Sequence, residues 1–446
     1  MASSKKLRHG ELAARLETFL KQAIKPGQRL LLALSGGLDS CVLLHLLAGL
    51  QVQCAFKLSA LHVNHGISPN AGDWQQFCAD LCTHHQISYT SQLVVVPRDS
   101  GLGIEAAARA ARYGVMLSQP VDVVVLAHHQ DDQAETLLLQ LLRGAGVQGL
   151  AAMPSKSETN TAMPTIMRPL LNIPRSVLEQ YAACHGLKWI EDESNLDLAY
   201  DRNFLRHHVL PELEKRFPAS RATLARSASH IAEAAYLLDE MAQEDAVQWI
   251  KHGRLEVGGL RAMSEPRAKN LLRYWLSAYL NEPPSTRRLQ DILRQLLEAR
   301  AEARIEITFD EGLVHRYRGE AWFDQKLATN QPEVLPWHGE SELPFSGGGL
   351  TFQHVAGHGI SLAKLAEEPL HIRLRTGGER LRLHRQGPLR SLKNLFQEAG
   401  VPAWHRLAQP LIYWREVLVC IPGIGVNADW QASADEAGLV ITWQRD

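Results

Sequence analysis

The stretch Leu30–Leu50, LLLALSGGLDSCVLLHLLAGL, decides the fold, because it holds a strand, a glycine loop and the start of a helix with almost nothing between them. Leu30–Leu34 is a short apolar run typical of a buried parallel strand, and Cys41–Leu47 has the apolar spacing of a helix packed on a sheet. Between them, Gly36 and Gly37 let the backbone turn sharply. The N–H groups at a helix start bind anions, so the loop SGGLDS predicts a phosphate site.

The loop is not of the Walker type, which spaces its glycines further apart and ends in Gly-Lys-Ser or Gly-Lys-Thr, because neither tripeptide occurs in the chain. An ordinary strand-to-helix turn would also explain two adjacent glycines. SGGLDS resembles instead the pyrophosphate loop of the N-type ATP pyrophosphatases, which cleave ATP between its α- and β-phosphates. That resemblance implies an ATP site and a Mg²⁺-binding Asp39, with the ATP-binding residues being Ser35, Gly36, Gly37, Leu38, Asp39 and Ser40.

Strands and helices alternate after this stretch. Apolar runs predict strands at 56–63, 87–96 and 121–127, and helical spacing predicts helices at 70–82, 103–117 and 132–143. This alternation predicts an α/β fold with a doubly wound parallel sheet. Ligands of such sheets lie at the C-terminal ends of the strands, so SGGLDS, HVNHG and LAHHQDD are expected on one rim.

The chain of 446 residues is long enough for two to four domains. We expect an α/β domain over residues 1–217, a mainly helical domain over 218–331 that ends in a strand pair (303–309 and 313–323), and a mixed α/β, basic domain over 345–446. The proline-punctuated segment 332–344 is expected to be a linker.

Composition favours a globular cytoplasmic protein. The net charge is -1, hydrophobic residues make up 45% and charged residues 21%, and no apolar run has the length of a membrane span or a secretory signal. The six cysteines form no Cys-x-x-Cys pair and are expected to be reduced. Cys78 and Cys82 lie one helical turn apart, and we interpret them as a packed helix face rather than zinc ligands.

The segment LAHHQDDQAE places three carboxylates, those of Asp131, Asp132 and Glu135, at the end of a predicted strand. One aspartate can cap the following helix. Crowded carboxylates repel one another unless a cation is present, and hard oxygen ligands suit Mg²⁺ held together with substrate phosphates. Solvated acids on a capped helix are the alternative, but they leave the adjacent His128 and His129 unexplained.

Two further motifs carry candidate polar side chains. In EAAARAARY one helix face carries Glu105, Arg109, Arg112 and Tyr113. Guanidinium groups pair well with phosphate, although a surface Glu–Arg pair also explains part of this pattern. In HVNHG, Asn64 and His65 are candidates to bind the nucleotide or the modified base, with a structural role equally open.

Basic residues cluster near the C-terminal end. Between His371 and Arg415 nine arginines and lysines face two acids, although the whole chain is nearly neutral. The cluster is interleaved with Phe396, Trp404, His384 and His405, which favours phosphate contact and base or sugar stacking, and a solvated arginine face is the alternative. Its candidate RNA-binding residues are Arg380, Arg382, Arg390 and Lys393, and a second basic stretch contributes Arg202, Arg206, His207, His208, Lys215 and Arg216.

Taken in order, these motifs resemble the tRNA(Ile)-lysidine synthetase family over nearly the whole chain. The matching segments are SGGLDS, HVNHGIS, EAAARAARY, LAHHQDDQAETLLLQLLRGAGVQGL, RPLL, DESNLDLAYDRNFLRHHVLP, LRTGGERLRL and LKNLFQEAGVPAWHRLAQPLIY. The resemblance implies an ATP- and Mg²⁺-dependent ligase. Such an enzyme adenylates the wobble cytidine in the CAU anticodon of an isoleucine tRNA, and L-lysine then displaces AMP to give lysidine.

The same resemblance implies roles for individual residues. Asp39 and Asp132 would bind Mg²⁺, with Asp131 as a competing candidate. His128 and Arg112 would stabilise the phosphate or the activated base, and Glu135 would orient the lysine amine. A related tRNA thiolase and a non-catalytic tRNA-binding protein are the alternatives. The oligomeric state, a homodimer included, is left open.

Overall fold

The structure, a computed structural model, describes residues 11–66, 68–95, 104–157, 163–299, 305–325, 334–365 and 368–445. The side chain of Glu105 lies outside this description, so its pairing with Arg109 stays a prediction. The chain forms two compact units, Met1–Met241 and Ala242–Asp446.

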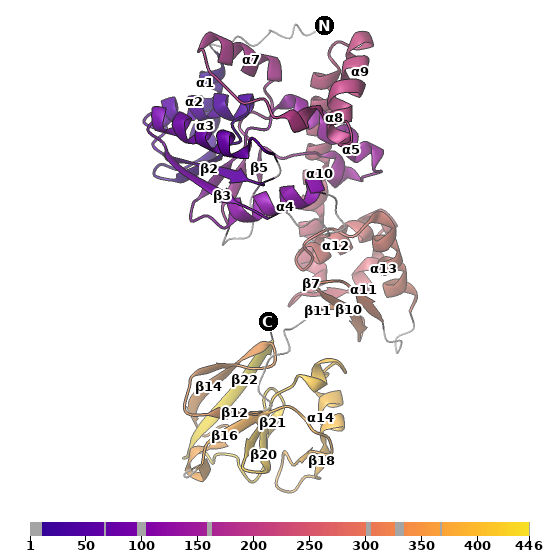
Figure 1. The fold of residues 1–446 in the computed structure, drawn as a ribbon. Helices are drawn as coiled ribbons and strands as arrows, with labels where there is room; N and C mark the ends of the chain where they lie inside the picture. The colour runs from indigo at the N-terminus through magenta and orange to yellow at the C-terminus, as the bar shows by residue number, and fades with distance from the viewer. Residues whose placement is uncertain are drawn as a thin grey trace. The chain divides into compact units, whose positions relative to one another are not determined.

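The first unit is built on a six-stranded sheet (Figure 1). In spatial order its strands are β3 (Ser88–Leu93), β2 (Lys57–Asn64), β1 (Arg29–Ala33), β4 (Val123–Val125), β6 (Thr165–Met167) and β5 (Lys156–Ser157). The first five run parallel, and the short edge strand β5 is antiparallel to β6. The predicted doubly wound parallel sheet is therefore confirmed.

Helices cover both faces of this sheet because the leucines of β1 alternate in direction. Leu30 and Leu32 point into a core shared with α1 (Leu12–Ala23), α2 (Leu38–Leu50), α3 (Ala71–His84) and α7 (Arg175–Cys184). Leu31 points into the opposite core, which α4 (Ile104–Leu117) covers. Cys78 and Cys82 of α3 are buried in the first core, so their interpretation as a packed helix face is confirmed.

The chain leaves β1 toward β2 on one side, and β4 lies on the other side. This reversal of strand order is the point at which doubly wound sheets bind ligands. SGGLDS follows β1 there, and LAHHQDD follows β4 and leads into α5 (Gln130–Leu142). The fold thus brings the two motifs to one place.

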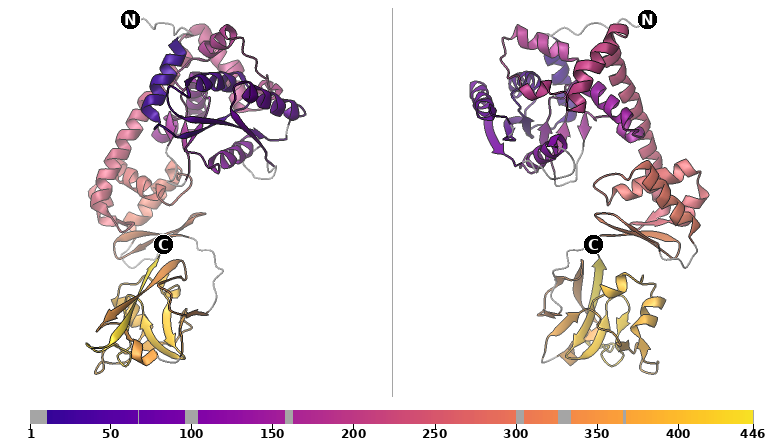
Figure 2. Two further views of the ribbon diagram at one scale, coloured as in Figure 1. Left: turned by 90° about the vertical axis from the view of Figure 1, so that its left-hand side faces the viewer. Right: turned by 45° about the vertical axis from the view of Figure 1, so that its right-hand side comes forward.

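Another helix completes the first unit after α6 (Val147–Leu150) and α7. It runs through Asp201–Arg216 as α8 (Asp201–Phe204), a π-helical turn (Leu205–Val209) and α9 (Leu210–Arg216). Pro211 has no N–H to donate to the preceding turn, which accounts for the widened π turn just before it. The long helix α10 (Ser220–Trp249) then crosses the boundary between the two units and stays unbroken in both views (Figure 2).

The second unit begins with helices packed on a sheet. The helices are α11 (Val257–Ala262), α12 (Glu265–Ser277) and α13 (Thr286–Glu298), and the antiparallel sheet has the order β7 (Ile250–Lys251), β8 (Arg254–Glu256), β11 (Glu320–Gln325), β10 (Gly312–Tyr317), β9 (Glu306–Thr308). The predicted single strand 313–323 is wrong. It is the hairpin β10–β11, which turns at Arg318 and Gly319, both with positive φ.

The C-terminal region consists of two antiparallel sheets around one core. One sheet is β12 (Val334–Trp337), β16 (Leu370–Arg373), β19 (Leu411–Trp414), β20 (Val417–Ile421), β21 (Gly425–Val426), and the other is β13 (Glu342–Pro344), β14 (Gly348–Ala356), β22 (Ala437–Arg445), β15 (Ile360–Ser361). A hairpin, β17 (Arg380–Leu381) and β18 (Arg390–Ser391), leads into α14 (Leu392–Glu398).

The expected linker 332–344 is wrong for its described part. Val334–Trp337 pairs with β16, and Glu342–Pro344 pairs with β14. Both segments are edge strands, where a proline without an N–H is tolerated. Prolines therefore mark the sheet edges here rather than an extended connection.

Across the described ranges, we find no helix that is both long and apolar enough to cross a bilayer. All six cysteines are free thiols.

Candidate active site

The loop after β1 is shaped by one glycine. Gly36 has a φ of +85°, and a Cβ there would lie 2.7 Å from Ile190 Cδ1 and 3.2 Å from Cys78 Sγ. The N–H of Ile190 also donates to the Gly36 carbonyl at 2.9 Å. A left-handed backbone with no room for a side chain requires glycine, so the sharp turn predicted for SGGLDS is present.

The helix that follows presents an uncapped N-terminus. Gly37 precedes α2 in an extended conformation, and no side chain caps the helix. The first N–H groups of an α-helix have no acceptor inside the helix. The Ser35 and Ser40 hydroxyls lie 3.1 Å apart beside them. These groups fit a pyrophosphate, and the anion site itself stays a prediction.

A buried histidine joins the two motifs. His129 is 2% exposed, and its Nε2 lies 3.5 Å from Asp39 Oδ2 and 3.4 Å from Asp132 Oδ2. Its backbone N–H donates to Asp132 Oδ2 at 2.8 Å, which is how Asp132 caps α5. Burial opposes a charge on His129, but the carboxylates of Asp132 and Asp39 outweigh it and raise its pKa.

Asp132 also accepts from two arginines. Its Oδ1 lies 2.8 Å from Arg202 Nη2 and 3.2 Å from Arg206 Nη2. Burial alone would raise the pKa of Asp132, but the charges of His129 and Arg202 hold it at about 2. Asp132 is therefore a carboxylate at neutral pH.

The same two arginines enclose Glu135, which is fully buried on α5. Arg202 Nε donates to its Oε2 at 2.7 Å, and Arg206 donates through Nε to Oε1 at 2.6 Å and through Nη2 to Oε2 at 2.9 Å. Both carboxylate oxygens are thus occupied. The sequence assigned Arg202 and Arg206 to RNA, whereas the structure pairs them with the carboxylates of α5, and their contact with RNA stays a prediction.

Asp131 has different partners. Its Oδ1 accepts from the backbone N–H of Arg175 at 3.1 Å, and its Oδ2 lies 3.1 Å from Arg221 Nη1. It approaches His129 only at Nδ1, at 3.9 Å. The two adjacent aspartates, which the sequence left as alternatives, therefore differ: Asp132 lies with Asp39 at the imidazole Nε2, and Asp131 does not.

His128 faces a cationic group of side chains. Burial lowers its pKa to about 3, and the charges of Arg202, Arg168 and Arg109 act in the same direction, so the imidazole is neutral. Its Nδ1 is buried without a hydrogen-bond partner in the described part of the chain. A neutral imidazole offers one N–H donor, so His128 can donate to a phosphate or a base but brings no charge.

Tyr113 holds two of these arginines in place. Its hydroxyl accepts from Arg109 Nη2 at 3.2 Å and from Arg168 Nη2 at 3.5 Å. Arg168 also donates to the carbonyl of Pro154 at 2.9 Å. Sequence reasoning quoted Arg168 only within RPLL and gave it no role, because its proximity to α4 depends on β6 joining the sheet next to β4.

The residues of the HVNHG segment have different surroundings. His62 is buried and its Nδ1 lies 3.0 Å from the Leu34 carbonyl, so it supports the fold. The Asn64 side chain accepts from the Gly66 N–H at 2.8 Å. Burial, followed by the charge of Arg112, lowers the pKa of His65. Arg112 and His65 therefore lie near each other.

The residues fit Mg²⁺. Asp39 Oδ1 is buried and has no hydrogen-bond partner among the described residues, although it is a carboxylate oxygen at the loop. No described cluster of three histidine, cysteine, aspartate or glutamate side chains would hold a metal alone. Mg²⁺ characteristically binds one or two carboxylates and completes its shell with water and substrate phosphates. Asp39 Oδ1 beside the loop fits such a ligand, whereas Asp132 would bind with oxygens that also accept from Arg202, Arg206 and the His129 N–H.

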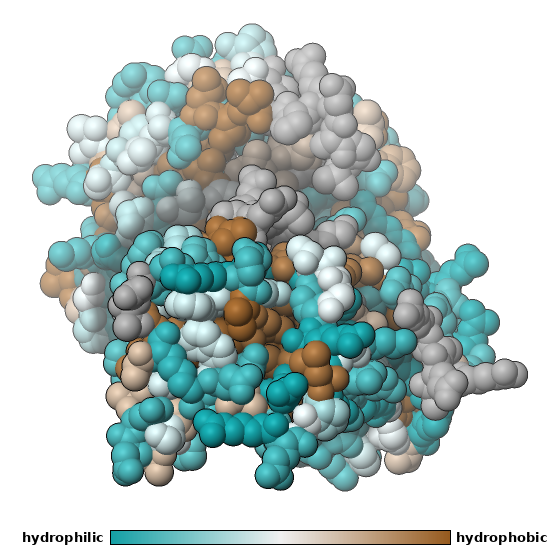
Figure 3. Space-filling model, turned by 90° about the horizontal axis from the view of Figure 1, so that it is seen from below, coloured by the Kyte–Doolittle hydropathy of each residue, from teal (hydrophilic) through white to brown (hydrophobic). Residues whose placement is uncertain are grey.

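The C-terminal basic cluster is only partly exposed. The Arg380 and Lys393 side chains are exposed, Arg390 is ion-paired with Glu398, and Arg382 Nε is buried without a partner in the described chain. Figure 3 shows a face on which hydrophilic side chains predominate. The candidate stacking residues differ from expectation, because Phe396 is fully buried and Trp404 stacks on His315 at 4.1 Å between ring centroids.

Three sequence profiles match the chain. The PP-loop domain matches residues 9–213, the TilS substrate binding domain residues 255–322, and the TilS substrate C-terminal domain residues 370–443. Among curated proteins, a tRNA(Ile)-lysidine synthase of Nitrosomonas europaea is 43% identical, with 99% of this chain and 98% of the relative aligned. Another, of Ralstonia nicotianae, is 41% identical over 92% and 91% of the two chains.

Two solved structures show weaker similarity. The U34-tRNA thiolase NcsA from Methanococcus maripaludis, with its [4Fe-4S] cluster, is 20% identical and covers 50% of this chain and 79% of its own, with a TM-score of 0.44. A TilS C-terminal domain is 22% identical and covers 23% of this chain and 89% of its own, with a TM-score of 0.21.

Proposed function

The chain belongs to the tRNA(Ile)-lysidine synthase family, and from this premise we propose how its own residues carry out the reaction. The enzyme ligates lysine to the wobble cytidine of the CAU anticodon of an isoleucine tRNA. ATP first adenylates the cytidine ring oxygen with release of pyrophosphate, and the ε-amine of L-lysine then displaces AMP. Activation is needed because the ring oxygen is a poor leaving group, and adenylation divides one difficult displacement into two easier ones.

The observation that carries the proposal is the meeting of Asp39 and Asp132 at His129 Nε2, beside the uncapped N-terminus of α2. The N–H groups of that first turn and the Ser35 and Ser40 hydroxyls bind the departing pyrophosphate. Asp39 and Asp132 would hold Mg²⁺, which would neutralise charge on the phosphates. His129 fixes the position of both carboxylates.

The cationic side chains act on the nucleotide. Arg112 neutralises phosphate charge, and neutral His128 donates a hydrogen bond to the phosphate or to the activated base. Glu135 would orient the lysine amine only after one of its guanidinium partners is displaced, because Arg202 and Arg206 occupy both carboxylate oxygens.

The remaining assignments also belong to this proposal. Residues 1–217 form the catalytic domain, and the regions 218–331 and 345–446 bind the tRNA, with Arg380, Arg382, Arg390 and Lys393 facing its phosphates. The six free thiols support a reaction in the cytoplasm. Sedimentation of the full chain tests whether it works as a homodimer.

One assay tests the function. The full chain is incubated with isoleucine tRNA carrying a CAU anticodon, labelled lysine, ATP and Mg²⁺, and label in the tRNA is counted together with AMP. Lysine transfer supports the proposal. Sulfur transfer would identify a tRNA thiolase instead, and tight tRNA binding without any transfer would identify a non-catalytic binding protein.

Matched substitutions test the metal ligands. Asp39→Asn and Asp132→Asn are expected to abolish adenylation or to raise the Mg²⁺ concentration for half-maximal rate more than tenfold, while tRNA affinity changes little. Asp131→Asn is the comparison, because that side chain pairs with Arg221 and is expected to leave the Mg²⁺ requirement near that of the wild type. A larger effect of Asp131→Asn than of Asp132→Asn would reverse the assignment.

A further inference from the structure

Different sides of the helix Asp201–Arg216 carry side chains with different partners. Arg202 and Arg206, four residues apart, reach the carboxylates of α5. Phe204 and His208, also four residues apart, are offset from them by two positions, which places them on another side of the helix. Their rings lie 5.7 Å apart between centroids and are nearly parallel, at 20°.

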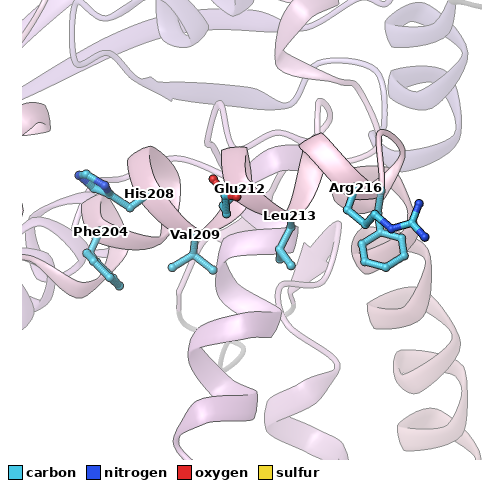
Figure 4. A pocket seen from close by; sticks show the side chains of 7 residues that line it. Phe204, His208, Val209, Glu212, Leu213 and Arg216 are labelled. Atoms are coloured by element: carbon cyan, nitrogen blue, oxygen red, sulfur yellow. The ribbon is translucent and has the colours of Figure 1, made fainter.

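These rings belong to a shallow apolar groove of about 360 Å³ (Figure 4). Its lining comprises Phe204, His208, Val209, Glu212, Leu213 and Arg216, with Phe217 beyond them. Phe204 is 48% exposed and Phe217 61% exposed. Contiguous exposed apolar surface marks a binding site more often than scattered exposed residues do.

The charges at the groove favour an anionic occupant. Glu212 is ion-paired with Lys215, which leaves it little net charge. Arg216 forms no ion pair within the described part of the chain, so its charge is available. Arg216 lies eight residues after His208, about 12 Å along the helix, so its guanidinium is at the other end of the groove (Figure 4). An exposed aromatic ring at one end and a cation at the other suit a single-stranded nucleic acid, because the ring can contact a base while the cation contacts a phosphate farther along the strand.

We propose that the Phe204–His208 pair stacks on an unpaired base of the tRNA anticodon loop, and this inference rests on the proposed function. The two sides of a helix lie about 10 Å apart, so the stacked base is a neighbour of the reacting cytidine and not the cytidine itself. The helix thereby binds the loop on one side while it holds the active-site carboxylates on the other.

The test uses full-length protein and an anticodon stem-loop of the isoleucine tRNA in which single loop bases are replaced by 2-aminopurine. Quenching of one such base on binding is expected with the wild type and with Phe204→Tyr. Phe204→Ala and Phe204→Leu are both expected to lose the quenching. They should also weaken tRNA binding by roughly 5- to 150-fold, the equivalent of one stacked base.

Phe204→Leu separates stacking from simple apolar contact, because leucine retains the apolar area without a ring. A Phe204→Leu protein that binds tRNA like the wild type would overturn the proposal. So would a dimer in sedimentation that Phe204→Ala dissociates with unchanged tRNA affinity, since the groove would then seat a second copy. Val52→Ala, at an exposed apolar residue elsewhere, is the control and should change neither quantity.

The proposed stacking site and the proposed reaction can be refuted independently of each other. Wild-type lysine transfer together with unchanged tRNA binding by Phe204→Ala would refute the stacking site alone. Quenching that depends on Phe204 without lysine transfer would refute the proposed reaction alone. Phe204 is half exposed, so its variants are expected to fold, and the thermal midpoint of each is measured beside its affinity.

Discussion

Gly36 is the residue whose identity the loop tolerates least. Its φ of +85° and the 2.7 Å approach of Ile190 Cδ1 to a Cβ make Gly36→Ala strained in both backbone and packing. We expect a loss of about 1–3 kcal/mol in the free energy of unfolding of the first unit. Urea denaturation followed by circular dichroism measures this loss, and pyrophosphate exchange should fall with it.

Gly37→Ala is the matched comparison for stability. Gly37 has an ordinary φ of -73°, and the nearest atom to a Cβ there is Ser35 Oγ at 3.5 Å. Its free energy of unfolding is expected to stay within about 0.5 kcal/mol of the wild type. Equal losses for both substitutions would contradict the account of Gly36.

For single residues, the sequence predicts which side chains belong to the site better than it predicts which of them contact one another. It predicted Asp39 and Asp132 at one site from parallel-strand topology. It did not give His129 a role, because HHQDD offers two histidines and only the geometry of the turn into α5 shows which one lies between the carboxylates. Ile190 behind Gly36 carried no local signal, since an isoleucine is unremarkable in any pattern.

Among the elements, the helix Asp201–Arg216 is expected to stabilise the first unit through its arginines. The double substitution Arg202→Met and Arg206→Met leaves Glu135 buried without a partner for its charge. A buried carboxylate deprived of its partners costs about 3–5 kcal/mol. Chemical denaturation measures the cost, and Lys215→Met, which breaks the exposed pair with Glu212, should cost less than about 1 kcal/mol.

Helices α2, α3 and α7 meet at a group of histidines, and this group predicts that the stability of the first unit depends on pH. His45 lies 5.5 Å from His85 and 5.1 Å from His185 between ring centroids, and its Nδ1 lies 2.9 Å from the Tyr181 hydroxyl. Burial lowers the pKa of His45, and charges on His185, His85 and His84 would lower it further.

The unfolded chain therefore binds more protons than the folded one below about pH 6.5, so stability falls as the pH drops through this range. The free energy of unfolding, measured at pH 7.5 and pH 5.5, should differ less in His45→Gln than in the wild type. His354→Gln, at an exposed histidine of β14, should keep the wild-type difference. If His45→Gln shows the same difference in unfolding free energy between the two pH values as the wild type, the histidine group does not cause the pH dependence.

The strands β1–β4 of the first unit were predictable from apolar runs, whereas the short strands β5 and β6 were not. The strands of the second unit were harder to predict from the sequence. Residues 313–323 read as one strand, since Arg318-Gly319 is not among the commonest hairpin turns. The edge strands β12 and β13 contain prolines, which favour a linker in the absence of their partners.

For the whole molecule, the C-terminal basic cluster predicts a graded salt dependence of tRNA binding. Each exposed phosphate contact contributes nearly one unit to the slope of log affinity against log salt. Arg380→Gln and Lys393→Gln should each lower the slope by about one. Arg390→Gln should lower it less, because Glu398 already neutralises that guanidinium. Filter binding from 50 to 200 mM salt measures the slopes, and equal effects of all three would show that the Arg390 pair opens in the complex.

The three predicted domains stay a prediction, and composition carries little signal for their boundaries. A junction was expected near residue 217, whereas the two compact units divide between Met241 and Ala242, within the continuous helix α10. A single helix leaves no glycine, proline or polar signal where it passes from one unit to the next, so its periodicity concealed the division.

The Ile190 support behind Gly36 also has a consequence for the order in which the protein is made. The nucleotide loop is complete in sequence by residue 40, yet it depends on Ile190, and the neighbouring carboxylates depend on Arg202, Arg206 and Arg221. At about 5–20 residues per second, a ribosome needs roughly 9–37 s to extend the chain from Gly36 to Arg221. A nascent chain arrested before Ile190 therefore exposes an unsupported loop, and ATP binding should begin only in chains that have emerged well past it.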